Sequence, residues 1–277
     1  MKKILAISGG IDSMCLLDMF KNDPEAIVAH FNHGTRPSSD DDQLFVAAFA
    51  KKYQLPFYTK KSILGPDVSE ADARAARYDF LNELAEELNG RIYTAHHLND
   101  LFESIAINIT RGTGWRGLTP FNNSTIEHPL LHFSKTEIYR YAYANGIVYR
   151  QDPTNTDSSY LRNRLRPAIA AMIIEQPDLA EKLHSLYLKQ TEIRQEIETL
   201  SEELLPRAGT YPRAAFTTLD DATAIELLHQ VLASHQISVT RPKLHDFLDA
   251  IRTYRPGKQF NLPKDRLVRF NKTSFML

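Results

Sequence analysis

The stretch from Lys2 to Ser13 restricts the fold of this chain more than any other part of the sequence. Its apolar residues from Ile4 to Ile7 predict a short buried strand, and the glycine pair that follows predicts a tight turn. The apolar run from Met14 to Phe20 then predicts a helix. Glycines leave backbone N–H groups accessible, and a helix N-terminus carries partial positive charge. The stretch therefore predicts a cradle for phosphate groups.

The predicted cradle carries polar side chains suited to a bound nucleotide. Ser8 and Ser13 offer hydroxyl donors, and Asp12 offers a carboxylate that holds Mg²⁺ or caps the helix. The stretch lacks the Gly-Lys-Ser/Thr ending of the usual P-loop and the third glycine of the dinucleotide fingerprint. An ordinary strand-to-helix turn is the alternative, and the complete Ser-Gly-Gly-x-Asp-Ser sequence disfavours it. The candidate nucleotide-binding residues are Ser8, Gly9, Gly10, Ile11, Asp12 and Ser13.

The composition is typical of a globular protein without disulfides. Of the 277 residues, 43% are hydrophobic and 24% are charged. The single cysteine, Cys15, excludes an internal disulfide and any Cys-x-x-Cys site. The apolar run after Lys3 breaks at Ser8, too soon for a signal peptide, and no stretch approaches the length of a membrane span. We therefore expect a cytoplasmic protein that does not contact a membrane.

Strand and helix signals alternate over the first half of the chain. After the first strand, further strands are predicted at residues 26–31, 56–59, 92–95 and 126–128, with helices at 39–53, 69–88, 100–111 and 134–145. This alternation predicts an α/β fold with a doubly wound, mainly parallel sheet covered on both faces. Ligands bind such sheets at the carboxyl ends of the strands, so Ser8, Asn32 and His96 are expected to converge there.

The character of the sequence changes after Asp157. We expect a nucleotide-binding domain over residues 1–157, a helical linker over 158–205 and a small α+β domain over 206–277. The last domain holds an excess of basic residues, which either form a solvated face or bind phosphates. Between Arg241 and Lys272 the acidic residues are Asp246, Asp249 and Asp265, and the basic residues are Arg241, Lys243, Arg252, Arg255, Lys258, Lys264, Arg266, Arg269 and Lys272.

The segment from Thr94 to Ser104 leaves a predicted strand and enters a helix. Adjacent His96 and His97 lack the spacing of a zinc site. Asp100 and Glu103 share a helix face and could hold Mg²⁺ or a substrate amine, or could simply favour the first helical turn.

Arginines follow in several places. Arg111 and Arg116 flank a glycine-rich loop that suits a phosphate ligand. Glu70, Arg74 and Arg77 lie on one helix face, where a surface ion-pair ladder is the simpler explanation. A turn-rich segment from Asp152 then leads into a basic helix that carries Arg162, Asn163 and Arg166.

The order of these motifs resembles the tRNA(Ile)-lysidine synthase family of the PP-loop ATP pyrophosphatases, over roughly Ile4 to Pro167. The motifs are Ser-Gly-Gly-x-Asp-Ser, Asn32-His33-Gly34, Glu70-x₃-Arg74-x₂-Arg77-Tyr78, Ala95-His96-His97, Arg111-Gly112, Asp152-x-x-Asn155 and Arg162-Asn163-x-x-Arg166. The resemblance implies an adenine nucleotide alpha hydrolase-like domain followed by parts that grip tRNA. By comparison with the family, we expect the chain to lack the second C-terminal subdomain that many members carry.

The reaction implied by the resemblance is the ATP-dependent attachment of L-lysine to the wobble cytidine of an isoleucine tRNA with a CAU anticodon. The base is adenylated first, with release of pyrophosphate, and lysine then displaces AMP. The resemblance implies ATP and Mg²⁺ as cofactors and tRNA and lysine as partners. It leaves open whether the chain forms a homodimer.

Roles are carried over from the resemblance residue by residue. The implied catalytic residues are Asp12, His97, Asp100, Glu103 and Arg111, with Asp12 and Asp100 as the metal ligands. The implied substrate-binding residues are Asn32, His33, Arg74, Arg77, Arg162, Asn163 and Arg166. The chain departs from the family at Thr35, Asn99, Leu101 and Ser104, and Asn99 removes a usual negative charge.

Two alternative functions remain open. One is another PP-loop tRNA-modifying or amide-forming synthetase. The lone Cys15 disfavours a two-cysteine thiolase, and the Arg162-Asn163 segment has no explanation in NAD or GMP synthetase. The other is a non-catalytic module that binds nucleotide or tRNA, which release of AMP and pyrophosphate would exclude.

Overall fold

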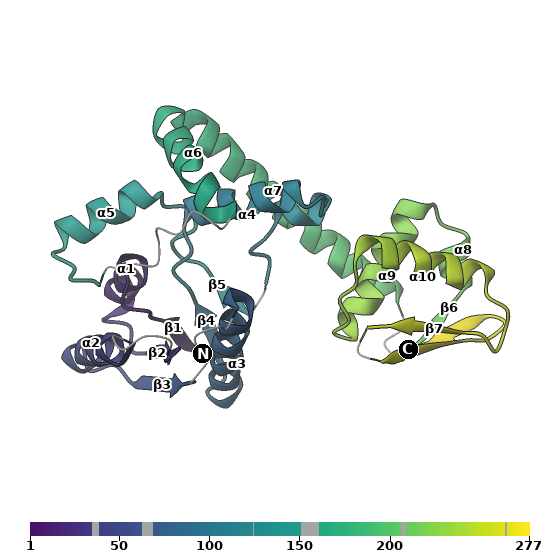
Figure 1. Cartoon of the computed structure of the whole chain (residues 1–277), viewed down its shortest axis with the longest axis horizontal. Coiled ribbons are helices and arrows are strands. Elements are labelled where there is room, and N and C mark those ends of the chain that lie inside the picture. The colour runs from purple at the N-terminus through teal and green to yellow at the C-terminus, as the bar shows by residue number, and fades with distance from the viewer. Residues whose placement is uncertain (35–38, 63–68, 124, 151–160, 206–208, 264) are drawn as a thin grey trace. The chain divides into compact units, whose positions relative to one another are not determined.

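The computed structural model forms two compact units, residues 1–187 and 188–277 (Figure 1). It describes the chain except residues 35–38, 63–68, 124, 151–160, 206–208 and 264, and except the side chains of Glu70, Ala71 and Asn163. Thr35, Asp152 and Asn155 therefore lie outside the described residues. The break between the units falls inside helix α7 (Pro177–Leu204). The domain limits expected at residues 157 and 205 stay predictions.

The first unit is built on a five-stranded sheet with the order β3-β2-β1-β4-β5. Its strands are β1 (Lys2–Ala6), β2 (Ala26–Asn32), β3 (Phe57–Lys61), β4 (Gly90–Tyr93) and β5 (Ile126–Glu127). Every neighbouring pair is parallel. The strand order reverses direction at β1, since β2 lies on one side of it and β4 on the other. Side chains that follow β1 and β4 therefore meet at the topological switch point, where ligands bind such sheets.

Helices cover both faces of this sheet, as the doubly wound prediction requires. Adjacent residues of β1 point to opposite faces, so Ile4 and Leu5 belong to different cores. Leu5 packs with α1 (Ile11–Phe20), α2 (Ser39–Lys52) and α5 (Lys135–Ala144). Ile4 packs with α3 (Glu70–Glu87). The predicted α/β fold class is confirmed.

Strand β4 begins earlier than the sequence indicated. The prediction placed it at residues 92–95 and used Gly90 to end the preceding helix, but Gly90 already pairs with Lys2 in the sheet. The left-handed backbone conformation after α3 belongs to Asn89, whose φ is 49°. The absence of a side chain at Gly90 serves a close approach instead, because a Cβ there would lie 2.9 Å from the carbonyl oxygen of Lys2.

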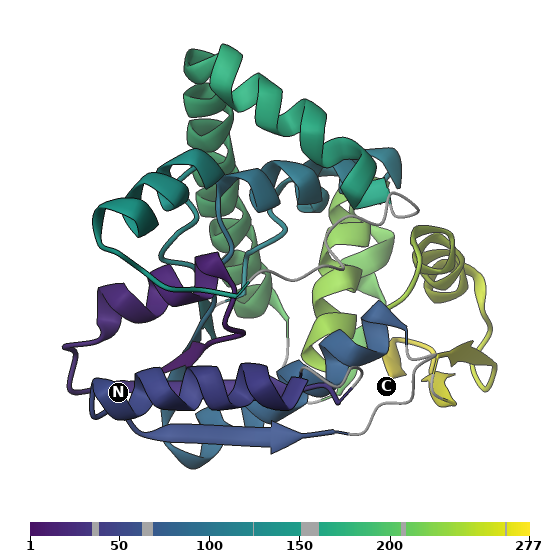
Figure 2. The same cartoon turned by 60° about the vertical axis from the view of Figure 1, so that its left-hand side comes forward.

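A helical layer adjoins the sheet within the first unit. Helix α4 (Leu98–Thr110) packs against α6 (Leu161–Glu175) and the first part of α7 (Figure 2). Leu101 and Phe102 meet Ile169 and Ile173 in their shared core. The single-turn helix η1 (Trp115–Leu118) follows α4 and contacts it. This packing places the arginines of α6 beside the first turns of α4.

The second unit contains an antiparallel sheet with the order β6-β9-β8-β7. Its strands are β6 (Thr210–Pro212), β7 (Gln259–Leu262), β8 (Arg266–Phe270) and β9 (Ser274–Met276). Helices α8 (Ala214–Thr217), α9 (Asp221–Ser234) and α10 (Arg241–Thr253) pack on it around an aromatic core that includes Phe216, Phe247 and Phe275. The predicted small α+β element at the C-terminal end is therefore present. In the part of the chain that the structure describes, no helix is long and apolar enough to span a membrane.

We predict that Gly90→Ala destabilises the first unit. The new Cβ would meet the Lys2 carbonyl at 2.9 Å and the Ile4 side chain at 3.0 Å, so β1 and β4 must separate locally. Overpacking of this kind costs about 1–3 kcal/mol, which lowers the thermal midpoint by several degrees. Calorimetry should show this loss, and Glu87→Ala at the exposed end of α3 should leave the midpoint close to that of the unsubstituted chain. An unchanged midpoint for Gly90→Ala would contradict the tight β1–β4 contact.

Candidate active site

The glycine turn after β1 is folded around the hydroxyl of Ser13. Its Oγ accepts the N–H groups of Ser8 and Gly9, at 3.2 and 3.1 Å, and donates to the carbonyl of Gly10 at 2.8 Å. Ser13 is buried, so its hydroxyl organises the loop instead of facing a ligand. Of the two serines expected to offer hydroxyls, Ser8 is the exposed one.

The turn requires glycine and leaves the start of α1 available. Gly9 has a φ of +94°, a conformation that side-chain-bearing residues rarely adopt, and its carbonyl accepts the N–H of Arg150 at 2.9 Å. Gly10 is the N-cap of α1 and has no side chain to cap the first turn. The N–H groups at the start of a helix attract anions, so the loop suits a phosphate.

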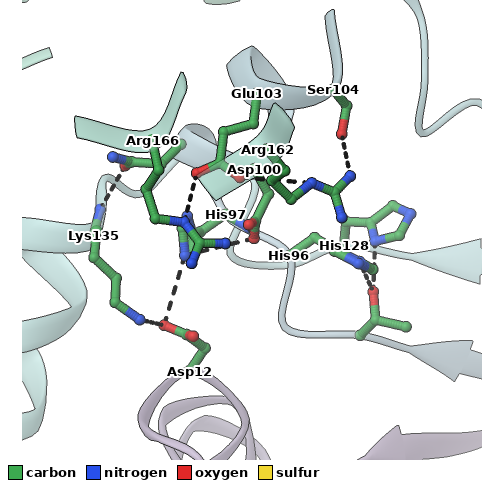
Figure 3. Close-up of polar contacts among 12 residues, drawn as sticks. Asp12, His96, His97, Asp100, Glu103, Ser104, His128, Lys135, Arg162 and Arg166 are labelled. Carbon is green, nitrogen blue, oxygen red and sulfur yellow. Dashed lines mark hydrogen bonds and ion pairs between the residues drawn. The ribbon is translucent and has the colours of Figure 1, made fainter. Parts of the chain in front are cut away.

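A lysine reaches this loop from a distant part of the chain. The ammonium of Lys135, the first residue of α5, lies 2.6 Å from Asp12 Oδ1 (Figure 3). The turn lacks the lysine of the usual P-loop, and Lys135 places a cation there from another part of the chain. Because the two residues are separated by 123 positions, no local sequence pattern indicates the contact.

Asn99 holds Lys135 in place. Its side chain is buried, and its Oδ1 accepts the backbone N–H of Lys135 at 2.9 Å. The carbonyl of Phe133 accepts the N–H of Leu98 nearby. These two hydrogen bonds join the beginnings of α4 and α5. Asn99, where the chain departs from the family pattern, makes one of them.

His97 lies between two carboxylates. Its Nε2 is 3.8 Å from Asp12 Oδ1 and 3.5 Å from Asp100 Oδ2, and its backbone N–H donates to Asp100 at 3.0 Å. The ring is almost fully buried, and its Nδ1 has no hydrogen-bond partner among the described residues. Asp12, His97 and Asp100, three of the predicted catalytic residues, are therefore brought together (Figure 3).

A polar pocket of about 290 Å³ opens beyond Asp100. Three arginines line it, Arg74 from α3, Arg111 after α4 and Arg162 from α6. Asp100 is the acidic residue of its wall. Arg74 rests against the ring of Tyr78, with its guanidinium carbon 5.0 Å from the ring centroid. The pocket therefore has several positive donors and one acceptor carboxylate.

Glu103 does not share the position of Asp100, although both lie on the first turns of α4. Its side chain is 1% exposed, and Arg166 Nε lies 3.1 Å from one carboxylate oxygen while Arg162 Nε lies 3.7 Å from the other. Burial raises the pKa of the Glu103 carboxyl, and the Arg166 guanidinium opposes this shift. In this arrangement Glu103 fastens the arginines of α6 over α4 (Figure 3).

Other predicted binding residues lie elsewhere. Asn32, the last residue of β2, is buried, and its amide group donates to Asp40 and Gln43 while its carbonyl oxygen accepts the N–H of Gly34. His33 packs against Phe31, with the ring centroids 4.8 Å apart. The bonds of Asn32 order the start of the β2–α2 connection, and a ligand contact for these two residues stays a prediction.

The neighbouring helix α3 carries the remaining predicted arginine. Arg77 lies with its guanidinium carbon 5.4 Å from the ring centroid of Tyr78. It is not part of the pocket lining that includes Arg74. The side chain of Asn163 is outside the described part, so its predicted contact stays untested.

The carboxylates suit a metal ion that arrives with a nucleotide. Within the described residues, no cluster of three or more His, Cys, Asp or Glu side chains could hold a metal ion. Mg²⁺ that accompanies nucleotide phosphates usually takes only one or two protein carboxylates, completing its shell with phosphate and water. Asp12 and Asp100, on either side of His97, meet that requirement.

We predict that Lys135→Met weakens binding of Mg-ATP about tenfold to a hundredfold, as loss of one charge-assisted hydrogen bond usually does. Isothermal titration calorimetry measures this effect directly.

Lys135→Arg keeps the positive charge and should bind Mg-ATP more tightly than Lys135→Met. Asn99→Asp keeps an acceptor for the Lys135 N–H and should fold like the unsubstituted chain. Equal affinity for Lys135→Met and the unsubstituted chain would show that Lys135 serves Asp12 alone.

Comparison with solved structures supports the fold. The U34-tRNA thiolase NcsA from Methanococcus maripaludis superposes with a TM-score of 0.57 at 16% sequence identity, over 69% of this chain and 72% of the thiolase. At this identity the likeness concerns the fold alone.

Comparison with curated proteins points to one kind of relative. The chain is 29% identical to tRNA(Ile)-lysidine synthase of Staphylococcus epidermidis over 94% of its own length and 66% of that relative. It is 36% identical to tRNA(Ile)-lysidine synthase of Thermus thermophilus over 65% of its own length and 37% of that relative. The chain thus spans less than two thirds of the length of these relatives.

The sequence resemblance to tRNA(Ile)-lysidine synthases is confirmed by these relatives. A protein-family model described as a PP-loop domain matches residues 1–173, which include the glycine turn, Lys135 and the arginines of α6. The matched region is more than half of the chain, and the chain belongs to the PP-loop domain family.

Proposed function

We propose that this chain attaches L-lysine to the wobble cytidine of an isoleucine tRNA bearing a CAU anticodon, using ATP. One observation carries the proposal, namely that His97 and Asp100 connect the glycine turn to the arginine-lined pocket. A nucleotide on the turn and an amino acid in the pocket would therefore meet at these side chains. The similarity to proteins named tRNA(Ile)-lysidine synthase supports this assignment.

ATP binds with its phosphates at the start of α1. The N–H groups of the first helical turn and the ammonium of Lys135 face the negative phosphate oxygens. Their interactions with these oxygens become stronger as charge develops on the leaving pyrophosphate. Mg²⁺, held by Asp12 or Asp100, would supply further positive charge to the phosphates. Lys135 then exchanges its contact with Asp12 for a phosphate oxygen.

Lysine binds in the arginine-lined pocket. Its carboxylate suits the guanidinium groups of Arg74, Arg111 and Arg162, because arginine offers paired donors in a planar fork. Asp100, the carboxylate of the pocket lining, lies beside His97 and binds an ammonium group of the substrate. Glu103 was predicted to share this task. Its two arginine partners support a role in positioning α6, and a contact of Glu103 with the amine stays a prediction.

The chemistry proceeds in two displacements. The wobble base leaves its stack, and its 2-oxo oxygen attacks the α-phosphorus of ATP, so that an O–P bond forms and pyrophosphate leaves. The ε-amine of lysine then attacks C2 of the activated base, the C–O bond breaks, and AMP leaves with the electron pair. The amine loses a proton as its bond to carbon forms. Adenylation makes a poor leaving oxygen into a good one.

The second unit supplies positive charge for the tRNA backbone. Several of its basic side chains are exposed, among them Arg255, Lys258, Arg266 and Arg269. Arg252 is an exception, since it donates to the carbonyls of Phe216 and Leu219 and stabilises the unit itself. The exposed set can neutralise phosphates without reading the sequence of the RNA.

A labelling experiment tests the proposed function. The chain is incubated with ATP, Mg²⁺, labelled lysine and unmodified isoleucine tRNA bearing CAU, and label in the RNA is counted. We expect incorporation that disappears when the wobble cytidine is replaced by uridine. AMP release with another acceptor, without incorporation of lysine, would favour another PP-loop synthetase. ATP binding without any release of AMP or pyrophosphate would favour a non-catalytic module.

We predict that the double variant Arg266→Ala and Arg269→Ala weakens tRNA binding and reduces its salt dependence. A plot of log K against log salt has a negative slope. With the value for duplex DNA, each lost phosphate contact reduces the magnitude of this slope by about 0.9. Filter binding over a salt series measures this slope. The double variant Lys51→Ala and Lys52→Ala, on exposed positions of α2, removes the same charge and should leave the slope unchanged. Equal slopes for both double variants would show that Arg266 and Arg269 on β8 do not contact tRNA phosphates.

A further inference from the structure

Two imidazole rings contact one hydroxyl group beside the arginine-lined pocket. Thr94 follows β4 and is buried, and its Oγ1 lies 2.7 Å from Nδ1 of His96 and 2.7 Å from Nδ1 of His128 (Figure 3). The ring of Phe121 packs against both imidazoles, with centroids 4.8 Å from each. His96 and Phe121 line the pocket, and Thr94 and His128 stand behind them.

The hydroxyl restricts the tautomers of the two histidines. Thr94 has one hydroxyl proton and two lone pairs, so it donates to at most one Nδ1, and at least one imidazole carries its proton on Nδ1. In the complementary arrangement Thr94 accepts from one Nδ1, whose ring presents a lone pair at Nε2, and donates to the other Nδ1, whose ring presents an Nε2–H.

Burial keeps both rings neutral, as the arrangement requires. It lowers the pKa of His96 well below the usual value and lowers the pKa of His128 to about 4. The charges of Arg74 and Arg77 disfavour protonation of His96 further. At neutral pH neither ring carries an extra proton that would break the complementarity.

Charged neighbours select which ring carries which proton. His96 lines the pocket together with Arg74, and a guanidinium group only donates hydrogen bonds, so a lone pair at His96 Nε2 is favoured. His128 is influenced by the negative charge of Glu127, and a neutral ring that accepts at Nδ1 carries its own proton at Nε2. The chain of donors therefore runs from His96 Nδ1–H to Thr94 and from Thr94 to Nδ1 of His128.

We propose that Thr94 and His128 are positioning residues that fix His96 in the Nδ1–H tautomer, so that His96 Nε2 accepts a hydrogen bond from the substrate amine in the pocket. Because Nδ1 of His96 is held by Thr94, Nε2 is the ring nitrogen left for a ligand. The nature of the amine rests on the proposed function. The tautomers do not, and they can be measured without substrate.

Nitrogen-15 NMR of the chain labelled on histidine tests the tautomers. Two-bond correlations between ring nitrogens and ring protons distinguish Nδ1–H from Nε2–H, and His96→Gln and His128→Gln serve to assign the signals. We expect Nδ1–H for His96 and Nε2–H for His128, and a shift of His96 toward Nε2–H in Thr94→Val. A His96 ring already in the Nε2–H form, or one unchanged by Thr94→Val, overturns the proposal.

Kinetics test the contact with the amine. Thr94→Val and His128→Leu should each raise the KM for lysine about tenfold, the usual effect of one weakened hydrogen bond, and leave the KM for ATP unchanged. His128→Asn keeps a polar atom at the place of Nδ1 and should restore the KM for lysine, whereas Thr125→Val, an exposed control, should change neither constant.

Equal loss in His128→Asn and His128→Leu, or a matched rise in both KM values, would indicate a structural role and contradict the proposal. If the unsubstituted chain attaches no lysine to RNA, the proposed function fails, and the assignment of the substrate amine fails with it. The NMR result then still decides whether Thr94 and His128 fix the tautomer of His96.

Discussion

The packing of α5 along α1 brings the ion pair of Asp12 and Lys135 to the glycine turn. The core that holds the two helices together contains Leu16 and Leu17 from α1 and Ile138 from α5. The pair leaves each charge close to the place where a phosphate and its metal would sit. Replacing the partner of Lys135 by a phosphate oxygen exchanges one favourable contact for another, so nucleotide binding need not break up the site.

A second charged contact gives the pocket its far wall. The Glu103 carboxylate is removed from water almost completely, and a buried charge is tolerated only when paired. Arg166 and Arg162 provide that pairing from α6, and the apolar contacts of α4 with α6 hold the helices in register. The same guanidinium of Arg162 reaches the pocket. Burial of Glu103 therefore determines where Arg162 lies in the pocket.

The sequence predicted the parts of the site that depend on local pattern. The strand, glycine turn and helix from β1 to α1 follow from apolar runs and glycines, and the grouping of His97 with Asp100 follows from their proximity in the chain. Contacts across the fold have no such signal. Lys135 joins Asp12 over 123 residues and His128 joins Thr94 over 34. Helical spacing placed Asp100 and Glu103 together, but their partners come from different elements, which only tertiary packing decides.

The contacts of Asn99 explain its departure from the family pattern better than the lost charge does. Taken by its charge alone, the loss of a usual carboxylate favours the alternative of a non-catalytic module. In the fold the side chain accepts the N–H of Lys135, a task that an amide oxygen performs as well as a carboxylate oxygen. A carboxylate there would add a second negative charge near Lys135 and compete with Asp12 for its ammonium. Asn99 keeps the joint between α4 and α5 while leaving Lys135 directed toward the glycine turn, so the substitution does not argue for a decayed site.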